Sequence, residues 1–124
     1  MMNKAEIDII HDNLVKNGKR FDSFKREGGF KYWIKRRERF KQAERILRRA
    51  LRKQPRMVPL LTTLGNVLYE QNKSSKALRY LERAYRISPR QTSGGLVTLG
   101  SIYYEKSKPN KARNIYKEYL RLFP

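Results

Sequence analysis

The sequence predicts an all-α fold made of stacked helix hairpins. Apolar residues recur at intervals of three and four residues, which is the spacing of one face of an α-helix. A set of Leu, Gly, Ala and Pro residues recurs every 34 or 35 residues along the chain. Turn-forming residues separate the two helical segments in the two clearest copies of this unit. A period of this length is typical of helical repeat proteins.

The recurring unit is clearest in the second half of the chain. Its first full copy consists of Leu61, Leu64, Gly65, Leu68, Ala77, Leu81, Ala84 and Pro89. The second copy lies 35 residues further on and matches these positions at Leu96, Leu99, Gly100, Tyr103, Ala112, Tyr116, Tyr119 and Pro124. The second half of the unit also occurs 34 residues before the first copy, at Ala43, Leu47, Ala50 and Pro55.

Each recurring position has a physical role. The leucines of the first copy form one apolar stripe, and Gly65 removes a side chain so that a second helix can approach closely. Residues 71–75, QNKSS, then form a turn, and Pro89 ends the second helix. In the second copy the turn reads KSKPN, and Pro109 falls near the first helical position, where proline is tolerated.

These positions resemble the tetratricopeptide repeat, whose pattern runs from a large residue through Leu-Gly, Tyr, Ala and an aromatic residue to Pro. The resemblance covers residues 58–91 and 93–124 in full, and residues 40–57 as the second helix alone. Leu61 and Leu96 stand where the family most often has Trp, and one extra residue separates the two copies. We expect neither departure to alter the packing. The resemblance implies helix-turn-helix repeats stacked as a short right-handed superhelix.

We expect a single domain with four segments. These are an N-terminal helix and loop over residues 1–20, a degenerate basic first repeat over 21–57, and two well-formed repeats over 58–91 and 92–124. The apolar face of the N-terminal helix would cover the edge of the first repeat, and it consists of Ile7, Ile10 and Leu14.

The first repeat leaves two arrangements open. The place of its turn holds Arg37, Glu38 and Arg39, without Gly, Pro or Asn. Two short helices fit this pattern, and so does one long helix from about Phe30 to Lys53.

The inventory of side chains argues against catalysis. The chain has no cysteine, and His11 is its only histidine, so it lacks a thiolate nucleophile and the usual zinc ligands. We therefore expect no enzymatic activity, no cofactor and no metal site. No stretch approaches the roughly 18 consecutive apolar residues of a membrane span. We expect a cytoplasmic protein without a membrane-spanning segment.

The resemblance also implies a binding groove. In the family, the first helices of successive repeats line a concave wall that holds a peptide. Tyr69 and Tyr104 recur in register there as large amphipathic anchors, and a plain solvated surface is the alternative for any one position. Thr62 and Thr98 occupy slots of the carboxylate clamp found in some members, which disfavours a chaperone-tail receptor. The full groove set is Thr62, Asn66, Tyr69, Glu70, Val97, Ser101, Tyr104 and Glu105.

The charge of the chain is the second functional signal. The net charge is +19 at pH 7, and residues 16–57 alone hold 17 basic and four acidic residues. We therefore expect the protein or peptide partner to be acidic. The alternative is RNA or DNA binding through a basic face of residues 31–56, where Tyr32 and Trp33 either stack on bases or lie in the core. This basic face, which could equally be a solvated surface, comprises Arg45, Arg48, Arg49, Arg52 and Lys53.

The last helix is expected from Pro109 to Phe123. Repeat arrays normally end in a polar capping helix, so this helix should present an apolar edge. We expect either self-association through Leu120, Leu122 and Phe123, or a longer array of which this chain is a part.

Overall fold

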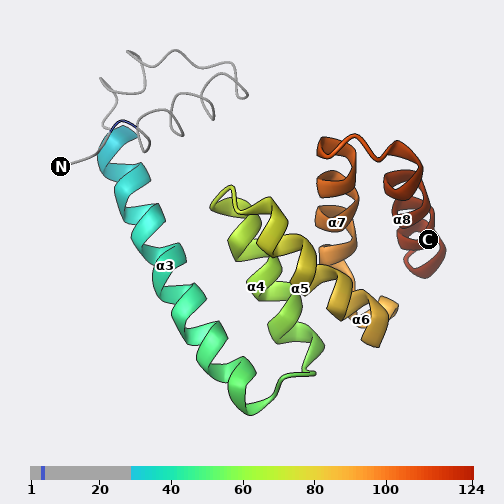
Figure 1. Cartoon of the computed structure of the whole chain (residues 1–124), viewed down its shortest axis with the longest axis horizontal. Coiled ribbons are helices and arrows are strands. Elements are labelled where there is room, and N and C mark those ends of the chain that lie inside the picture. Colours follow the sequence, from blue (N-terminus) through green and yellow to red (C-terminus); the bar gives the residue numbers. More distant parts are fainter. Residues whose placement is uncertain (1–3, 5–28) are drawn as a thin grey trace. The chain divides into compact units, whose positions relative to one another are not determined.

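The computed structural model describes the backbone of residue 4 and of residues 29–124, and the side chains of residue 4 and of residues 34–124 (Figure 1). The segment expected as an N-terminal helix and loop, and the side chains of Tyr32 and Trp33, lie outside this description. The chain divides into two compact units, Met1–Glu38 and Arg39–Pro124. The second unit contains both well-formed repeats.

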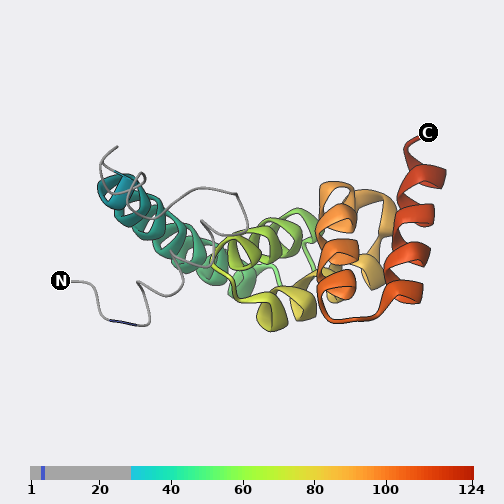
Figure 2. The same ribbon diagram turned by 90° about the horizontal axis from the view of Figure 1, so that it is seen from above.

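Residues 29–124 form six helices and no strand, so the all-α, tetratricopeptide-like expectation is confirmed (Figures 1 and 2). Within the second unit, α4 and α5 form one hairpin, and α7 and α8 form another. The helices are α3 (Gly29–Lys53), α4 (Val58–Glu70), α5 (Ser74–Ile87), α6 (Pro89–Thr92), α7 (Gly94–Glu105) and α8 (Pro109–Leu122).

The two hairpin turns lie where the sequence predicted them. Each contains one residue in the left-handed backbone region, Asn72 with φ 61° and Ser107 with φ 59°, and these residues are equivalent in the two repeats. Asn tolerates this conformation better than most residues. Pro109 is the first residue of α8, as expected from its missing N–H group.

One long helix, α3, is the arrangement found for residues 29–53. Arg37, Glu38 and Arg39 continue the helix because nothing in this stretch favours a turn. Ala43 and Leu47, which belong to the recurring stripe, are therefore only half-buried. Among the described side chains of α3, Leu51 alone is buried.

The predicted apolar stripes form the core of the second unit. Burial of each large aliphatic side chain stabilises the fold by about 1.5 to 3 kcal/mol. The fully buried residues of the two hairpins include Leu61, Leu64, Leu68, Ala77, Leu81, Ala84, Leu96 and Ile102.

The two glycines predicted at the helix crossings do make close contacts. A Cβ atom on Gly65 would lie 2.6 Å from side-chain carbons of Leu81, and one on Gly100 would lie 2.5 Å from the ring of Tyr116. Both distances are well inside van der Waals contact, so a side chain at either position would push the helices apart. Leu81 is fully buried and has no room to move, whereas Tyr116 is 36% exposed.

The extra residue between the repeats changes the local chain path but not the packing. Residues Pro89–Thr92 form the short helix α6, in which Thr92 is fully buried, and Ser93 follows with φ 35°. A Cβ atom on Gly95 would lie only 2.7 Å from Thr62, so α7 still packs closely on α4.

The carboxylate of Glu44 joins α3 to the first hairpin. It accepts hydrogen bonds from Arg48 at 3.0 Å, Gln71 at 3.0 Å and Lys73 at 3.1 Å. Partial burial opposes ionisation of Glu44, but the hydrogen bonds from Arg48, Lys73 and Gln71 outweigh it and lower the pKa of this carboxyl from its ordinary value. The ionised form of Glu44 therefore holds α3 against the α4–α5 turn.

The terminal helix α8 differs from expectation at one residue. Leu120 is 64% exposed, but Leu122 is buried. Phe123 is half-buried and packs on Tyr119, with ring centroids 5.4 Å apart. The expectation that Leu122 mediates self-association is wrong, because its side chain already lies in the core.

Gly65→Leu should lower the free energy of unfolding by about 1 to 3 kcal/mol, because the new side chain would overlap the immobile Leu81. Urea denaturation followed by circular dichroism measures the change. Gly94→Ala is the control, since a Cβ atom there has no neighbour within 4 Å, and its stability should be unchanged. Wild-type stability of Gly65→Leu would contradict the close crossing.

Glu44→Gln should lower the stability by about 1 kcal/mol near neutral pH, because charge-assisted hydrogen bonds become neutral ones. The folded pKa lies below the unfolded value of about 4.3. The contribution of the carboxylate is thus present above that value and is lost as the pH falls through the folded pKa.

Urea denaturation at about pH 7 and about pH 3 tests this expectation, since the difference between variant and wild type should shrink in acid. Glu38→Gln is the control, because the Glu38 side chain is 53% exposed and contributes little at either pH. A difference that stays constant with pH would show that Glu44 acts through its shape and not its charge.

Candidate functional site

The eight predicted groove residues lie on two helices that contact each other. We call this set the α4–α7 surface. α4 supplies Thr62, Asn66, Tyr69 and Glu70, and α7 supplies Val97, Ser101, Tyr104 and Glu105. The half-buried members are Thr62, Asn66, Tyr69 and Ser101, and the exposed members are Glu70, Val97, Tyr104 and Glu105.

A hydrogen bond crosses this surface from one repeat to the next. The Tyr69 hydroxyl donates to Glu105 Oε1 at 2.5 Å. Burial disfavours the phenolate, and together with the Glu105 carboxylate it raises the pKa of Tyr69 to about 12. Tyr69 thus stays a neutral donor whose hydroxyl is engaged. Tyr104, by contrast, is 71% exposed.

Two polar atoms on α4 are buried without a hydrogen-bond partner. They are Thr62 Oγ1 and Asn66 Oδ1, which lie one helical turn apart on the same side of α4. A buried polar atom without a partner destabilises the fold by about 1 to 3 kcal/mol. Neither atom is accessible to solvent, although the Thr62 and Asn66 side chains as a whole are half-buried.

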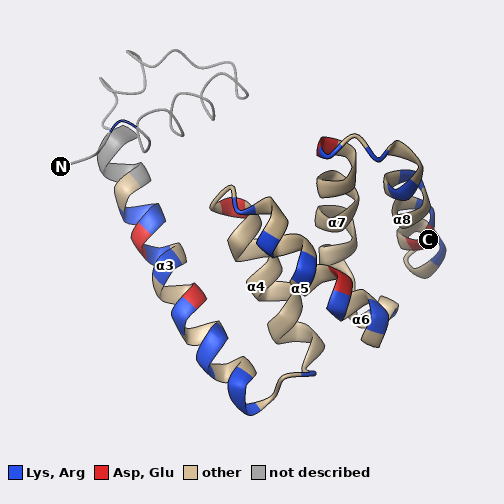
Figure 3. Cartoon of the chain, viewed as in Figure 1, with Lys and Arg blue, Asp and Glu red and all other residues tan. Residues whose placement is uncertain are grey.

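The α4–α7 surface carries no positive charge. α4 and α7 contain no Lys or Arg, and Glu70 and Glu105 are the charged residues of the set. Figure 3 shows blue segments on α3, α5 and α8 and none on α4 or α7. The acidic partner expected from the net charge therefore has no electrostatic counterpart on this surface.

The predicted basic face of α3 consists of two kinds of residue. Arg45, Arg49, Arg52 and Lys53 are exposed. Arg48 is half-buried and donates hydrogen bonds to Glu44 at 3.0 Å and to the Tyr80 hydroxyl at 2.8 Å. Its guanidinium also lies 5.7 Å from the centre of the Tyr80 ring. Arg48 thus contributes to the attachment of α3 as well as to its charge.

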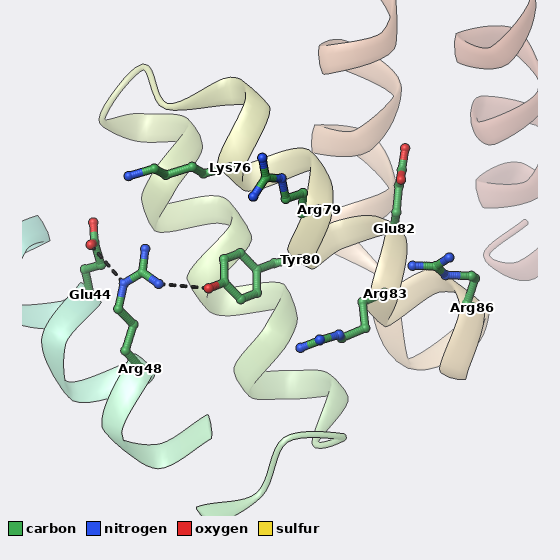
Figure 4. A pocket seen from close by; sticks show the side chains of 8 residues that line it. All are labelled: Glu44, Arg48, Lys76, Arg79, Tyr80, Glu82, Arg83 and Arg86. Carbon is green, nitrogen blue, oxygen red and sulfur yellow. Dashed lines mark hydrogen bonds and ion pairs between the residues drawn. The ribbon is translucent and has the colours of Figure 1, made fainter. Parts of the chain in front are cut away.

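A hollow lined by residues of α3 and α5 shares no residue with the groove set (Figure 4). We call it the α3–α5 hollow; its volume is about 760 Å³. Of its lining residues, the sequence had singled out Arg48 alone as a site residue. The regular spacing of basic residues on α5 is the sequence pattern that would have indicated its four cations in this lining. The lining comprises Glu44, Arg48, Lys76, Arg79, Tyr80, Glu82, Arg83 and Arg86.

Two further features are absent from the described part of the chain. No group of three or more His, Cys, Asp or Glu residues lies there in a metal-binding arrangement. None of the helices described here is both long and apolar enough to cross a membrane.

Comparison with known proteins agrees with the packing of the two hairpins. Two family models described as tetratricopeptide repeat match the chain, one over residues 35–92 and the other over residues 94–124. No curated protein matches it. Repeats of this family generally mediate protein–protein interactions, and proteins built from them are typically non-enzymatic scaffolds. The two matches and the glycine-mediated crossings together show that the chain belongs to the tetratricopeptide repeat family.

Proposed function

We propose that this protein is a non-enzymatic interaction module that binds an extended segment of a protein partner across the α4–α7 surface. The observation that carries the proposal is the exposure of two large residues of this surface, Val97 and Tyr104, on α7. α7 is the first helix of its repeat, and the family uses the first helices to line its groove.

The chemistry of the surface suits a peptide backbone. The side-chain amide of the half-buried Asn66 can hydrogen-bond a peptide group through its NH2 group. The exposed Tyr104 and Val97 add apolar contact from α7.

The bound segment should be neutral or basic, and not acidic. The exposed Glu105 would repel a carboxylate, and neither α4 nor α7 carries a Lys or Arg that would attract one. α3, α5 and α8 carry Lys and Arg residues that contribute to the positive net charge of the chain (Figure 3). An acidic region of the partner would be steered toward those helices and would lie outside the α4–α7 surface.

Tyr104→Ala should weaken binding by more than about 1 kcal/mol, as loss of an aromatic anchor commonly does. The probe is a peptide selected on the wild-type protein from a random displayed library, with affinity measured by fluorescence anisotropy. Leu120→Ala is the matched control, because Leu120 is a large exposed apolar residue on α8 outside the surface. If Leu120→Ala weakened binding and Tyr104→Ala did not, the proposal would fail.

Asn66→Ala should affect stability and binding in opposite directions. It removes an acceptor without a partner and adds a good helix former, so the free energy of unfolding should stay constant or rise by up to about 1 kcal/mol. The affinity for the selected peptide should nevertheless fall. Urea denaturation and anisotropy on the same preparation measure the two effects. A variant that is less stable and binds normally would show that Asn66 has a structural role only.

A further inference from the structure

The α3–α5 hollow has a large excess of available positive charge. Five cations and two carboxylates line it, and both carboxylates are already engaged. Glu44 accepts three hydrogen bonds, and Glu82 accepts one from the Tyr103 hydroxyl at 2.7 Å. Within the described part of the chain, no ion pair joins the four cations of α5 that line the hollow to a carboxylate; these are Lys76, Arg79, Arg83 and Arg86.

These four cations form one row along α5. Their spacing of three, four and three residues keeps them on one face of the helix. The row spans ten residues, which corresponds to about 15 Å at the rise of an α-helix. In Figure 4 the cationic ends of Lys76, Arg79 and Arg83 lie around the ring of Tyr80, with Arg48 on the other side. A ligand that meets the whole row must carry several anionic groups in series.

The form of the hollow favours one class of polyanion. Arginine, which dominates the lining, binds phosphate in a bidentate way. Tyr80 is the one aromatic residue of the lining, and Arg48 contacts both its hydroxyl and its ring, so the cations supply most of the groups that a ligand would meet. A row of cations along one helix matches phosphates in series along one strand.

We propose that the α3–α5 hollow binds the phosphate backbone of a single-stranded nucleic acid, without reading its sequence. Lys76, Arg79, Arg83 and Arg86 each neutralise one phosphate over about four nucleotides. Arg48, which is held by Glu44 and Tyr80, forms the opposite wall. This binding is independent of the peptide binding proposed for the α4–α7 surface, because the two sites share no residue.

The test measures the affinity of oligo(U) RNA and oligo(dT) DNA, each of about 20 nucleotides, by fluorescence anisotropy over a series of salt concentrations. Wild type should bind both alike, with a slope of log affinity against log salt of about −3, from about −0.7 per phosphate contact. Arg79→Gln with Arg83→Gln should weaken the slope by about 1.4 and lower the affinity at least about tenfold. Both residues are exposed, so folding should be unaffected.

The matched control is Arg113→Gln with Lys117→Gln, which removes the same charge from exposed positions of α8. It should change the affinity by no more than about threefold. An equal loss in both double variants would mean diffuse attraction and overturn the site, as would undetectable binding by wild type.

Two competitors decide the class of ligand. Poly-glutamate that displaced the RNA at equal charge concentration would assign the hollow to an acidic protein, and a duplex that bound more tightly than the single strand would overturn the proposed strand geometry. Tyr104→Ala should leave nucleic acid binding unchanged, so failure of either proposal can be recognised separately.

Discussion

The close approach of paired helices at Gly65 and Gly100 is the constraint on which the rest of the structure depends. A Cβ atom at either position would overlap Leu81 or Tyr116 of the facing helix, so each hairpin keeps its close crossing without disturbing that side chain only when glycine stands there. That crossing buries the leucine stripe of α4 against the alanines of α5. It also fixes which sides of α4 and α7 remain free to contact each other. The composition of the α4–α7 surface is therefore a consequence of how the hairpins pack.

The same packing separates charge from the groove. α4 and α7 are flanked by their hairpin partners and by each other, so most of their positions are apolar or small, and neither contains Lys or Arg. The second helices have one side free to solvent, and the basic residues lie there and on α3. The net charge of +19 is a property of the whole chain, and it does not describe the surface on which a peptide would bind. The expectation of an acidic partner in the groove came from assigning the charge of the whole chain to the groove surface.

The sequence predicted the parts of the fold that local rules decide. The period located both hairpins, and the turn residues, Pro109 and the small-residue crossings all lie where helix chemistry places them. It left one helix and two open for residues 30–53, because the apolar spacing of the repeat favours a break there while no turn-forming residue is present to make it. The path through Ser93 and the buried state of Leu122 also depend on tertiary contacts.

The candidate sites were predictable to different degrees. The repeat pattern predicted which residues would stand at the groove positions. It could not predict their hydrogen bonding and burial, because the Tyr69–Glu105 bond and the buried, unpartnered Asn66 oxygen depend on how neighbouring helices pack. The α3–α5 hollow was missed because its lining joins residues more than 25 positions apart, from Arg48 to Lys76 and beyond. Nothing in the local sequence of α5 marks its basic residues as one wall of a hollow, because α3 supplies the other wall.

The two surfaces differ in how far their side chains are held in place before a ligand arrives, and this difference bears on specificity. On the α4–α7 surface the Tyr69–Glu105 bond joins one repeat to the next, and the half-buried Thr62 and Asn66 lie on the same helix as Tyr69. Polar groups that are held in place discriminate between ligands, because a ligand that fails to pair them forfeits their hydrogen bonds. In the α3–α5 hollow, only Arg48 is fixed on both sides. The long side chains of α5 can adapt to anions at varied spacings, so attraction there should depend on charge and salt more than on sequence.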